Sequence, residues 1–83
     1  MRITVKYFAS VREALGPQES IEVPEGSTVG SLRVLLQSRS SAHAEVLASG
    51  RVLRAALDQA LCDESARLRD GVEVAFFPPV TGG

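Results

Sequence analysis

The length of 83 residues limits the chain to one domain, too small to enclose a deep catalytic pocket with machinery of its own. Hydrophobic residues make up 45% and charged residues 23% of the sequence, which excludes a disordered chain and predicts a compact globular fold. The net charge of -1 comes from acidic and basic residues scattered singly along the chain, without the basic stripe that is typical of nucleic-acid binding.

Residues 2–8 alternate between apolar and polar side chains, which predicts a half-buried strand. Directly after this strand, Ser10 and Glu13 have the spacing of a capping box, in which each side chain bonds the other residue's backbone amide. We therefore expect a helix that begins at Ser10. Gly16 and Pro17 stop it after little more than one turn.

Residues 20–23 alternate again and predict a second short strand, which ends at the turn of residues 24–26 and pairs with the first strand. Ser27 or Thr28 then caps the main helix. The apolar residues that follow have helical spacing and predict one face packed against a sheet. They are Val29, Leu32, Leu35 and Leu36.

Residues 38–42 read as loop, and residues 43–48 predict a further helical turn. Beyond them, residues 53–57 and residues 60–62 predict two short strands that form a hairpin. Asp58 lies at its turn, since aspartate tolerates left-handed backbone geometry.

Asp70 and Gly71 predict a tight turn before the last strand, residues 72–77. The first and last strands alternate most regularly, so we expect them to lie side by side, and therefore parallel, in the middle of a mixed sheet. The order of elements predicts an α+β protein in which this sheet packs on one main helix, a β-grasp or ubiquitin-like fold. We expect the domain to span residues 1–77 and a flexible tail to span residues 78–83.

Catalytic side chains are scarce. His43 is the only histidine and Cys62 the only cysteine, and no pattern brings the two together as a nucleophilic pair. We expect a surface histidine and a small buried thiol. The sequence has no metal-ligand motif and no glycine-rich phosphate loop, so we expect no metal and no bound cofactor. A lone cysteine and the lack of an apolar run long enough to cross a bilayer predict a cytoplasmic protein that binds no membrane.

The last eight residues, FFPPVTGG, are the most unusual stretch. The two prolines keep the backbone extended and cannot continue a sheet ladder, so the chain leaves the fold there and can extend by roughly 20 Å. Glycine passes through a slot too narrow for any side chain. We expect the α-carboxylate of Gly83 to be delivered into another protein's active site, where an activating enzyme is needed because a carboxylate is a poor electrophile. The residues expected to insert with it are Pro78, Pro79, Val80, Thr81 and Gly82.

A second signal lies on the face of the sheet turned away from the helix. The alternation places Phe8 and Phe77 on this face, and Leu61 joins them from the short strand of the hairpin. Apolar side chains gathered beside the exit of the tail predict a docking patch for a partner.

Three segments resemble the MoaD family, the ubiquitin-like sulfur carriers that form the small subunit of molybdopterin synthase: YFASVREALG, GSTVGSLRVLL and, most specifically, DGVEVAFFPPVTGG. The sequence departs from the family pattern at Asp58 and Val72, both away from the tail. The resemblance implies that the chain is a carrier without an active site of its own. It also implies a heterotetramer with the large subunit, contacted through Phe8, Leu61 and Phe77.

The resemblance further implies how the carrier is loaded. A MoeB-like adenylyltransferase would use ATP to join Gly83 to AMP, and a sulfur donor would convert the adenylate to a thiocarboxylate. The loaded tail would then enter a MoaE-type large subunit and donate sulfur to the cyclic pterin precursor (cPMP), which forms the dithiolene of molybdopterin. These steps belong to molybdenum cofactor biosynthesis.

Three other readings of the sequence stay open. The chain resembles, less closely, a ThiS-like sulfur carrier that serves another pathway, although such carriers lack the Phe-Phe-Pro-Pro segment. A ubiquitin-like modifier would join Gly83 to lysines of target proteins, and the single lysine, Lys6, disfavours chains built on the protein itself. A β-grasp interaction module with an inert tail is the third.

Overall fold

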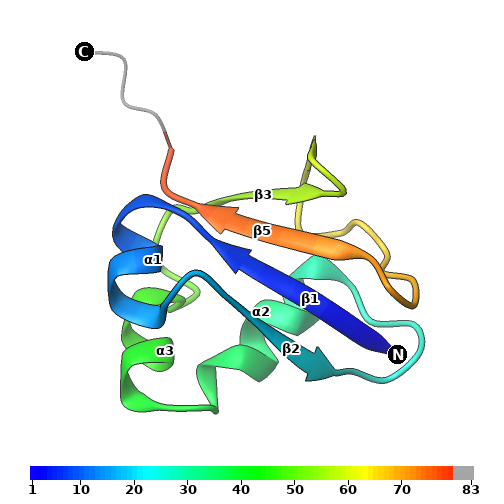
Figure 1. Cartoon of the computed structure of the whole chain (residues 1–83), viewed down its shortest axis with the longest axis horizontal. Coiled ribbons are helices and arrows are strands. Elements are labelled where there is room, and N and C mark those ends of the chain that lie inside the picture. The colour runs from blue at the N-terminus through cyan, green and yellow to red at the C-terminus, as the bar shows by residue number, and fades with distance from the viewer. Residues whose placement is uncertain (80–83) are drawn as a thin grey trace.

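The structure is a computed structural model that describes residues 1–79, which form a five-stranded mixed sheet and three helices (Figure 1). The α+β class and the β-grasp architecture predicted from the sequence are confirmed. The predicted tail residues Val80, Thr81, Gly82 and Gly83 lie outside the described residues. In chain order the elements are β1 (Arg2–Tyr7), α1 (Ala9–Leu15), β2 (Gln18–Glu22), α2 (Val29–Gln37), α3 (Ser41–Val46), β3 (Arg54–Leu57), β4 (Ala60–Cys62) and β5 (Glu73–Phe77).

The sheet has the strand order β2-β1-β5-β3-β4, so the first and last strands are neighbours in its interior. β1 and β5 run parallel, with Val5 opposite Val74, as the sequence predicted. β1 and β2 pair antiparallel, and β3 pairs antiparallel with both β5 and β4. Residues from the two ends of the described chain therefore meet in the centre of the sheet.

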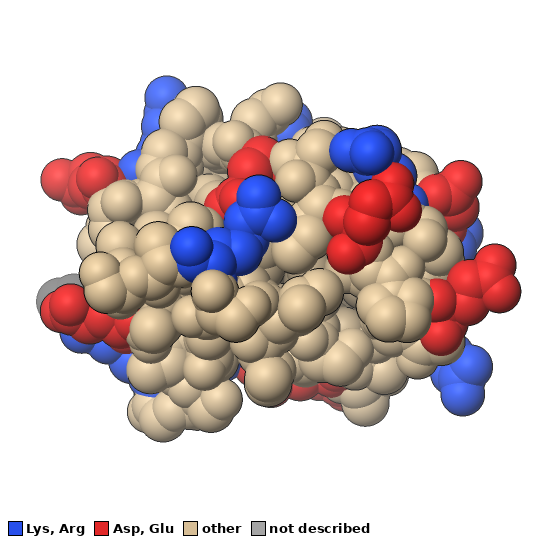
Figure 2. Space-filling model, turned by 90° about the horizontal axis from the view of Figure 1, so that it is seen from below, with Lys and Arg blue, Asp and Glu red and all other residues tan. Residues whose placement is uncertain are grey.

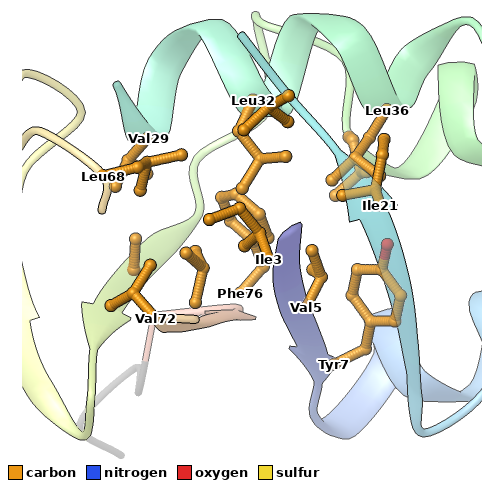
Figure 3. Packing of buried hydrophobic residues seen from close by; sticks show 14 of the residues in the cluster. Ile3, Val5, Tyr7, Ile21, Val29, Leu32, Leu36, Leu68, Val72 and Phe76 are labelled. Carbon is orange, nitrogen blue, oxygen red and sulfur yellow. The ribbon is translucent and has the colours of Figure 1, made fainter. Parts of the chain in front are cut away.

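One hydrophobic core fills the space between the sheet and the helices (Figure 3). From the sheet, Ile3, Val5 and Tyr7 of β1 and Val74 and Phe76 of β5 belong to it. Val29, Leu32 and Leu36 of α2 point into it from the other side. Leu35 was expected on the same face but is 38% exposed. At 3.6 residues per turn, Leu35 lies about 100° around the helix from Leu36, which turns its side chain towards solvent.

The predicted start of the first helix is wrong. α1 begins at Ala9 and is capped by Phe8 without any side-chain hydrogen bond, so Ser10 and Glu13 form no capping box. The amide of Phe8 still bonds the carbonyl of Phe76 in the sheet, and the chain bends sharply at Ala9, where φ is 53°. The helix thus begins one residue earlier than expected and makes about two turns before Gly16, whose φ of 90° confirms the predicted stop.

The other predicted boundaries agree more closely with the structure. Thr28 rather than Ser27 caps α2, in a reciprocal pair of bonds with Ser31. Ser40 caps α3, so the helix begins inside the stretch that was expected to be loop. The hairpin around Asp58 is confirmed, because Asp58 and Gln59 both have positive φ values, 45° and 72°, as a tight turn requires.

Candidate functional site

The face of the sheet opposite the helices carries a shallow groove with a volume of about 410 Å³. It lies over β1, β5 and β3 and is bounded on one side by the β3–β4 hairpin. Because successive side chains of a strand point to opposite faces, the residues between the core positions of each strand meet here. We call this feature the outer groove, and it is lined by Lys6, Phe8, Ala56, Gln59, Leu61, Glu73, Ala75 and Phe77.

The structure brings together all three residues that the sequence predicted as a docking patch. Phe8, Leu61 and Phe77 come from three separate elements, and each lines the outer groove. Phe8 is 45% and Leu61 66% exposed, and Phe77 is half-buried. The predicted geometry of the patch is thus present, and its role in partner binding stays a prediction.

Backbone contacts hold the two aromatic residues of this patch in place. The amide of Phe8 donates to the carbonyl of Phe76 at 3.2 Å, which positions Phe8 at the end of β1 beside the end of β5. Phe76 itself points into the core, so the next residue, Phe77, faces the outer groove. β5 ends at Phe77, and Pro78 and Pro79 follow outside the strand, as expected from the missing amide of proline.

Sequence reasoning missed the other residues of the groove. Lys6 and Glu73 form an ion pair across the parallel strands, with Nζ and Oε1 3.4 Å apart. The alternation of β1 and β5 places both on this face, together with Ala75, but it does not single them out as site residues. Ala56 could be found only from the register of β3 against β5, and Gln59 only from the geometry of the hairpin.

A second polar cluster lies on the helix side of the sheet, around Glu19 of β2. Its Oε2 accepts a hydrogen bond from the hydroxyl of Tyr7 at 2.6 Å and lies 2.7 Å from Nε2 of His43, while its Oε1 lies 2.9 Å from Nε of Arg39. His43 was expected on the surface, but its side chain is only 14% exposed. His43 also lies 2.7 Å from the hydroxyl of Ser40 through Nδ1, so its partners link α3 to the sheet.

The cluster changes the acid–base behaviour of its members. Burial alone would raise the pKa of Glu19, but hydrogen bonds from Tyr7 and His43 and the charges of His43 and Arg39 lower it on balance. The pKa of Tyr7 is raised, chiefly by burial and then by its hydrogen bond to the Glu19 carboxylate. Both shifts favour a neutral tyrosine beside an ionised carboxylate. The half-buried Cys62 also has a raised pKa, because of burial and the nearby charge of Asp63, which leaves its thiol protonated.

Histidine, cysteine and acidic side chains do not gather into a candidate metal site in the part of the chain that the structure describes. No group of three histidine, cysteine or acidic side chains converges there. On the face shown in Figure 2, blue basic and red acidic side chains lie among uncharged ones, without a continuous basic area. Within residues 1–79, no helix has the length and apolar character needed to cross a bilayer.

The central strand β5 ends beside the outer groove, and the sequence continues from there into Pro-Pro and a final Gly-Gly. The profile of the ThiS family matches residues 5–83. The chain belongs to the ThiS family. One curated relative is the molybdopterin synthase sulfur carrier subunit of Escherichia coli strain K12. It is 43% identical to this ThiS family member over 98% of this chain and 99% of the relative. The protein of the same name from Mycobacterium tuberculosis strain H37Rv is 36% identical over 100% of this chain and 99% of the relative. The resemblance to MoaD proteins is thereby confirmed.

Solved structures support the same fold for this member of the ThiS family. The solution structure of the HVO 2177 protein of Haloferax volcanii has a TM-score of 0.82 at 27% identity and covers 100% of this chain and 87% of that one. The protein–protein complex of subunits 1 and 2 of the molybdopterin-converting factor from Helicobacter pylori 26695 contains a chain with a TM-score of 0.69 at 28% identity. That match covers 100% of both chains.

Proposed function

We propose that this chain is the sulfur-carrier small subunit of a molybdopterin synthase. The observation that carries the proposal is the 43% identity to the Escherichia coli carrier over nearly the whole of both chains. The outer groove supports it, because Phe8, Leu61 and Phe77 gather where the chain leaves the sheet. The structural similarity to a chain of the Helicobacter pylori complex supports a large-subunit partner.

The proposed reactive group is the α-carboxylate of Gly83. An ionised carboxylate resists nucleophilic attack, so a MoeB-like adenylyltransferase first joins it to the α-phosphate of ATP and releases pyrophosphate. Sulfide from a sulfur donor then attacks the acyl carbon and forms the carbon–sulfur bond, and AMP leaves as the acyl–oxygen bond breaks. The product is a thiocarboxylate, whose sulfur is a better nucleophile than a carboxylate oxygen.

The large subunit provides the site where this sulfur is used. In the proposed cycle, residues 78–83 extend into a MoaE-type subunit over a reach of roughly 20 Å. The thiocarboxylate sulfur attacks cPMP, and water then cleaves the acyl–sulfur bond, which returns Gly83 to the carboxylate. Two such transfers supply the two sulfur atoms of the dithiolene. We propose that two carriers and two large subunits form the complex. Since the loading step consumes ATP, we propose that the carrier works in the cytoplasm. We also propose that it binds no cofactor itself.

The other candidate functions have weaker support. The structure of the small archaeal modifier protein SAMP1 from Haloferax volcanii has a TM-score of 0.77 at 24% identity, which shows the fold alone. A ThiS-like carrier for another pathway would share the same loading chemistry and would differ in the partner that accepts the sulfur. The curated relatives favour molybdopterin synthase over both.

The proposal is tested by the intact mass of the protein after incubation with ATP, the activating enzyme and a sulfur source. We expect a mass gain that corresponds to one oxygen replaced by sulfur, followed by its loss when the large subunit and cPMP are added. A variant without Gly83 is the control and should stay unchanged. The proposal is wrong if the loaded protein never forms, or if the Gly83 deletion still supports molybdopterin synthesis in a strain that lacks the natural carrier.

A further inference from the structure

The floor of the outer groove is made by two alanines that lie directly opposite one another. Ala56 of β3 pairs with Ala75 of β5 in the antiparallel register. Their exposed fractions are only 7% and 6%, yet neither belongs to the hydrophobic cluster on the helix side of the sheet. Their burial therefore comes from the walls of the groove, and their methyl groups form its floor.

The strand register adds one residue on each side of the alanine pair, which gives a row of four residues across four strands. Lys6 of β1 lies opposite Ala75 on one side, and Leu61 of β4 lies opposite Ala56 on the other. Two short side chains are thus bracketed by two long ones. With neighbouring strands about 4.8 Å apart, the backbones of β1 and β4 are separated by roughly 14 Å at this row. Along β5 itself, Phe77 and Glu73 close the two ends of the space above Ala75.

We propose that Ala56 and Ala75 are specificity-determining residues, and that the hollow above them receives one large apolar side chain from the large subunit. This inference rests on the proposed function. The hollow has the width of two strands, which suits a single aromatic or long aliphatic side chain. Apolar anchors that fill a pocket in this way supply much of the affinity of protein interfaces.

The charges around the hollow favour an apolar occupant. Lys6 and Glu73 are the charged residues that line it, and they pair with each other. A charged occupant would lose its hydration without finding an unpaired partner among these lining residues. Gln59 is the one neutral polar side chain in the lining, whereas small-molecule sites depend on several well-placed polar groups. The lining therefore fits a protein side chain better than a metabolite.

The position of the hollow also indicates which protein supplies that side chain. Phe77 belongs to its wall and directly precedes Pro78, the first residue of the proposed tail. A partner that accepts the tail must therefore contact the surface of the sheet next to the hollow. The exposed side chains of Phe8 and Leu61 stand at the rim, where they contact the same partner.

The inference is tested by filling the hollow. Ala75→Leu and Ala56→Leu each place a larger side chain on the outer face, away from the core. Ser20→Leu is the matched control, because Ser20 is exposed on the edge strand β2 and shares this face through its pairing with Thr4. The affinity of each full-length variant for the large subunit of the same organism is measured by calorimetry, and its folding by thermal unfolding.

We expect Ala75→Leu and Ala56→Leu to unfold cooperatively and to lose roughly tenfold or more in affinity for the large subunit. Ser20→Leu should stay within about twofold of the wild type. Single alanine replacements of the large subunit's surface apolar residues should then include one that restores binding to Ala75→Leu. That residue identifies the side chain that enters the hollow.

The inference is overturned if the folded leucine variants bind as tightly as the wild type. It is also overturned if no large-subunit variant restores binding. The smaller substitution Ala75→Val takes the place of Ala75→Leu if the latter does not fold, and it must also weaken binding. A wild-type chain that dimerises through the hollow, and whose Ala75→Leu variant is monomeric with unchanged affinity for the large subunit, contradicts it as well. In all these cases the proposed function stands, whereas a wild-type chain that does not bind the large subunit ends both.

Discussion

Two consecutive phenylalanines lie on opposite faces of the sheet at the end of β5. Phe76 is buried in the core against the helices, and Phe77 lines the outer groove on the other side of the sheet. The pleat of a strand alone produces this division, because successive side chains point to opposite faces. The same residue type therefore stabilises the fold at one position and is available to a partner at the next.

This division predicts different results for two alanine substitutions. Phe77→Ala should weaken large-subunit binding by roughly tenfold or more and lower the free energy of unfolding only slightly. Phe76→Ala should remove about 3 to 5 kcal/mol of stability, because it leaves a cavity in the core. Calorimetric titration and urea unfolding measure the two effects. Equal losses of stability in both variants would show that Phe77 belongs to the core.

Glu19 shows how one partly buried carboxylate can hold several elements together. It accepts from Tyr7 of β1 and contacts His43 of α3 and Arg39, which follows α2. Its pKa is lowered in the folded protein, so the ionised carboxylate stabilises the fold. That contribution is complete above the usual value of 4.5 and is lost as the pH falls below it, through the lowered pKa of the folded state.

Glu19→Gln should therefore lower the free energy of unfolding by about 1 to 2 kcal/mol at neutral pH. The difference from the wild type should shrink as the pH falls below 4.5, because the wild-type carboxylate becomes protonated as the pH passes through its lowered pKa in the folded state. Urea unfolding at several pH values measures this dependence. Glu22→Gln is the control, since Glu22 pairs with Arg2 on the surface, where such pairs contribute little. A pH-independent difference would contradict the assignment.

At the scale of elements, side chains of α2 hold the segment between α3 and β3, since Gln37 as well as Arg33 donates to the carbonyl of Leu47. Arg33 of α2 is buried, and its Nε donates to the carbonyl of Leu47 at 2.8 Å. Its Nη2 donates to the carbonyls of Ala48 and Arg51 at 2.5 and 2.6 Å, and its Nη1 bonds Glu64 at 2.6 Å. One guanidinium thus satisfies backbone groups that no strand pairs.

Arg33→Lys should not be conservative. An ammonium group cannot reach all these acceptors at once, so we expect a loss of about 2 to 3 kcal/mol in the free energy of unfolding. Arg12→Lys is the matched control on α1, where Arg12 is exposed, and should change stability by less than about 0.5 kcal/mol. Thermal unfolding compares the two variants. Similar unfolding midpoints would show that the arginine network contributes little.

The sequence predicted those features that depend on local periodicity. Alternation of period two identified β1 and β5 and both of their faces, and the helical spacing identified α2. The start of α1 was wrong because the sheet bond of Phe8 outcompetes the capping box at Ser10. Phe8 and Phe77 follow from alternation, whereas the alanine floor depends on the register between β3 and β5. The contacts of Arg33 join residues far apart in sequence, which no local pattern reports.

At the scale of the whole molecule, the first and last strands, β1 and β5, pair inside the sheet. β1 and β5 form the central parallel pair, so the sheet is incomplete without residues 73–77. The described core residues reach from Ile3 to Phe76. The proposed tail begins directly after β5, which ends at Phe77. Truncation of the tail should therefore abolish sulfur transfer and leave the stability of the domain unchanged.

Removal of residues 80–83 should change the free energy of unfolding by less than about 0.5 kcal/mol and abolish thiocarboxylate formation. Removal of residues 73–83 takes β5 out of the sheet and should leave the chain unfolded. Circular dichroism during heating measures the first property, and intact mass after loading measures the second. A clear loss of stability in the shorter truncation would place residues 80–83 in the folded domain.

The position of β5 also determines how the domain responds to mechanical load. β5 is hydrogen-bonded to β1 on one side and to β3 on the other. If a partner holds the face of the sheet, as proposed, tension on Pro79 acts on the end of β5. Such a pull strains the bonds of both ladders together in shear and does not open them one after another from an edge. In the proposed cycle, the large subunit would therefore insert or release the tail without unfolding the domain.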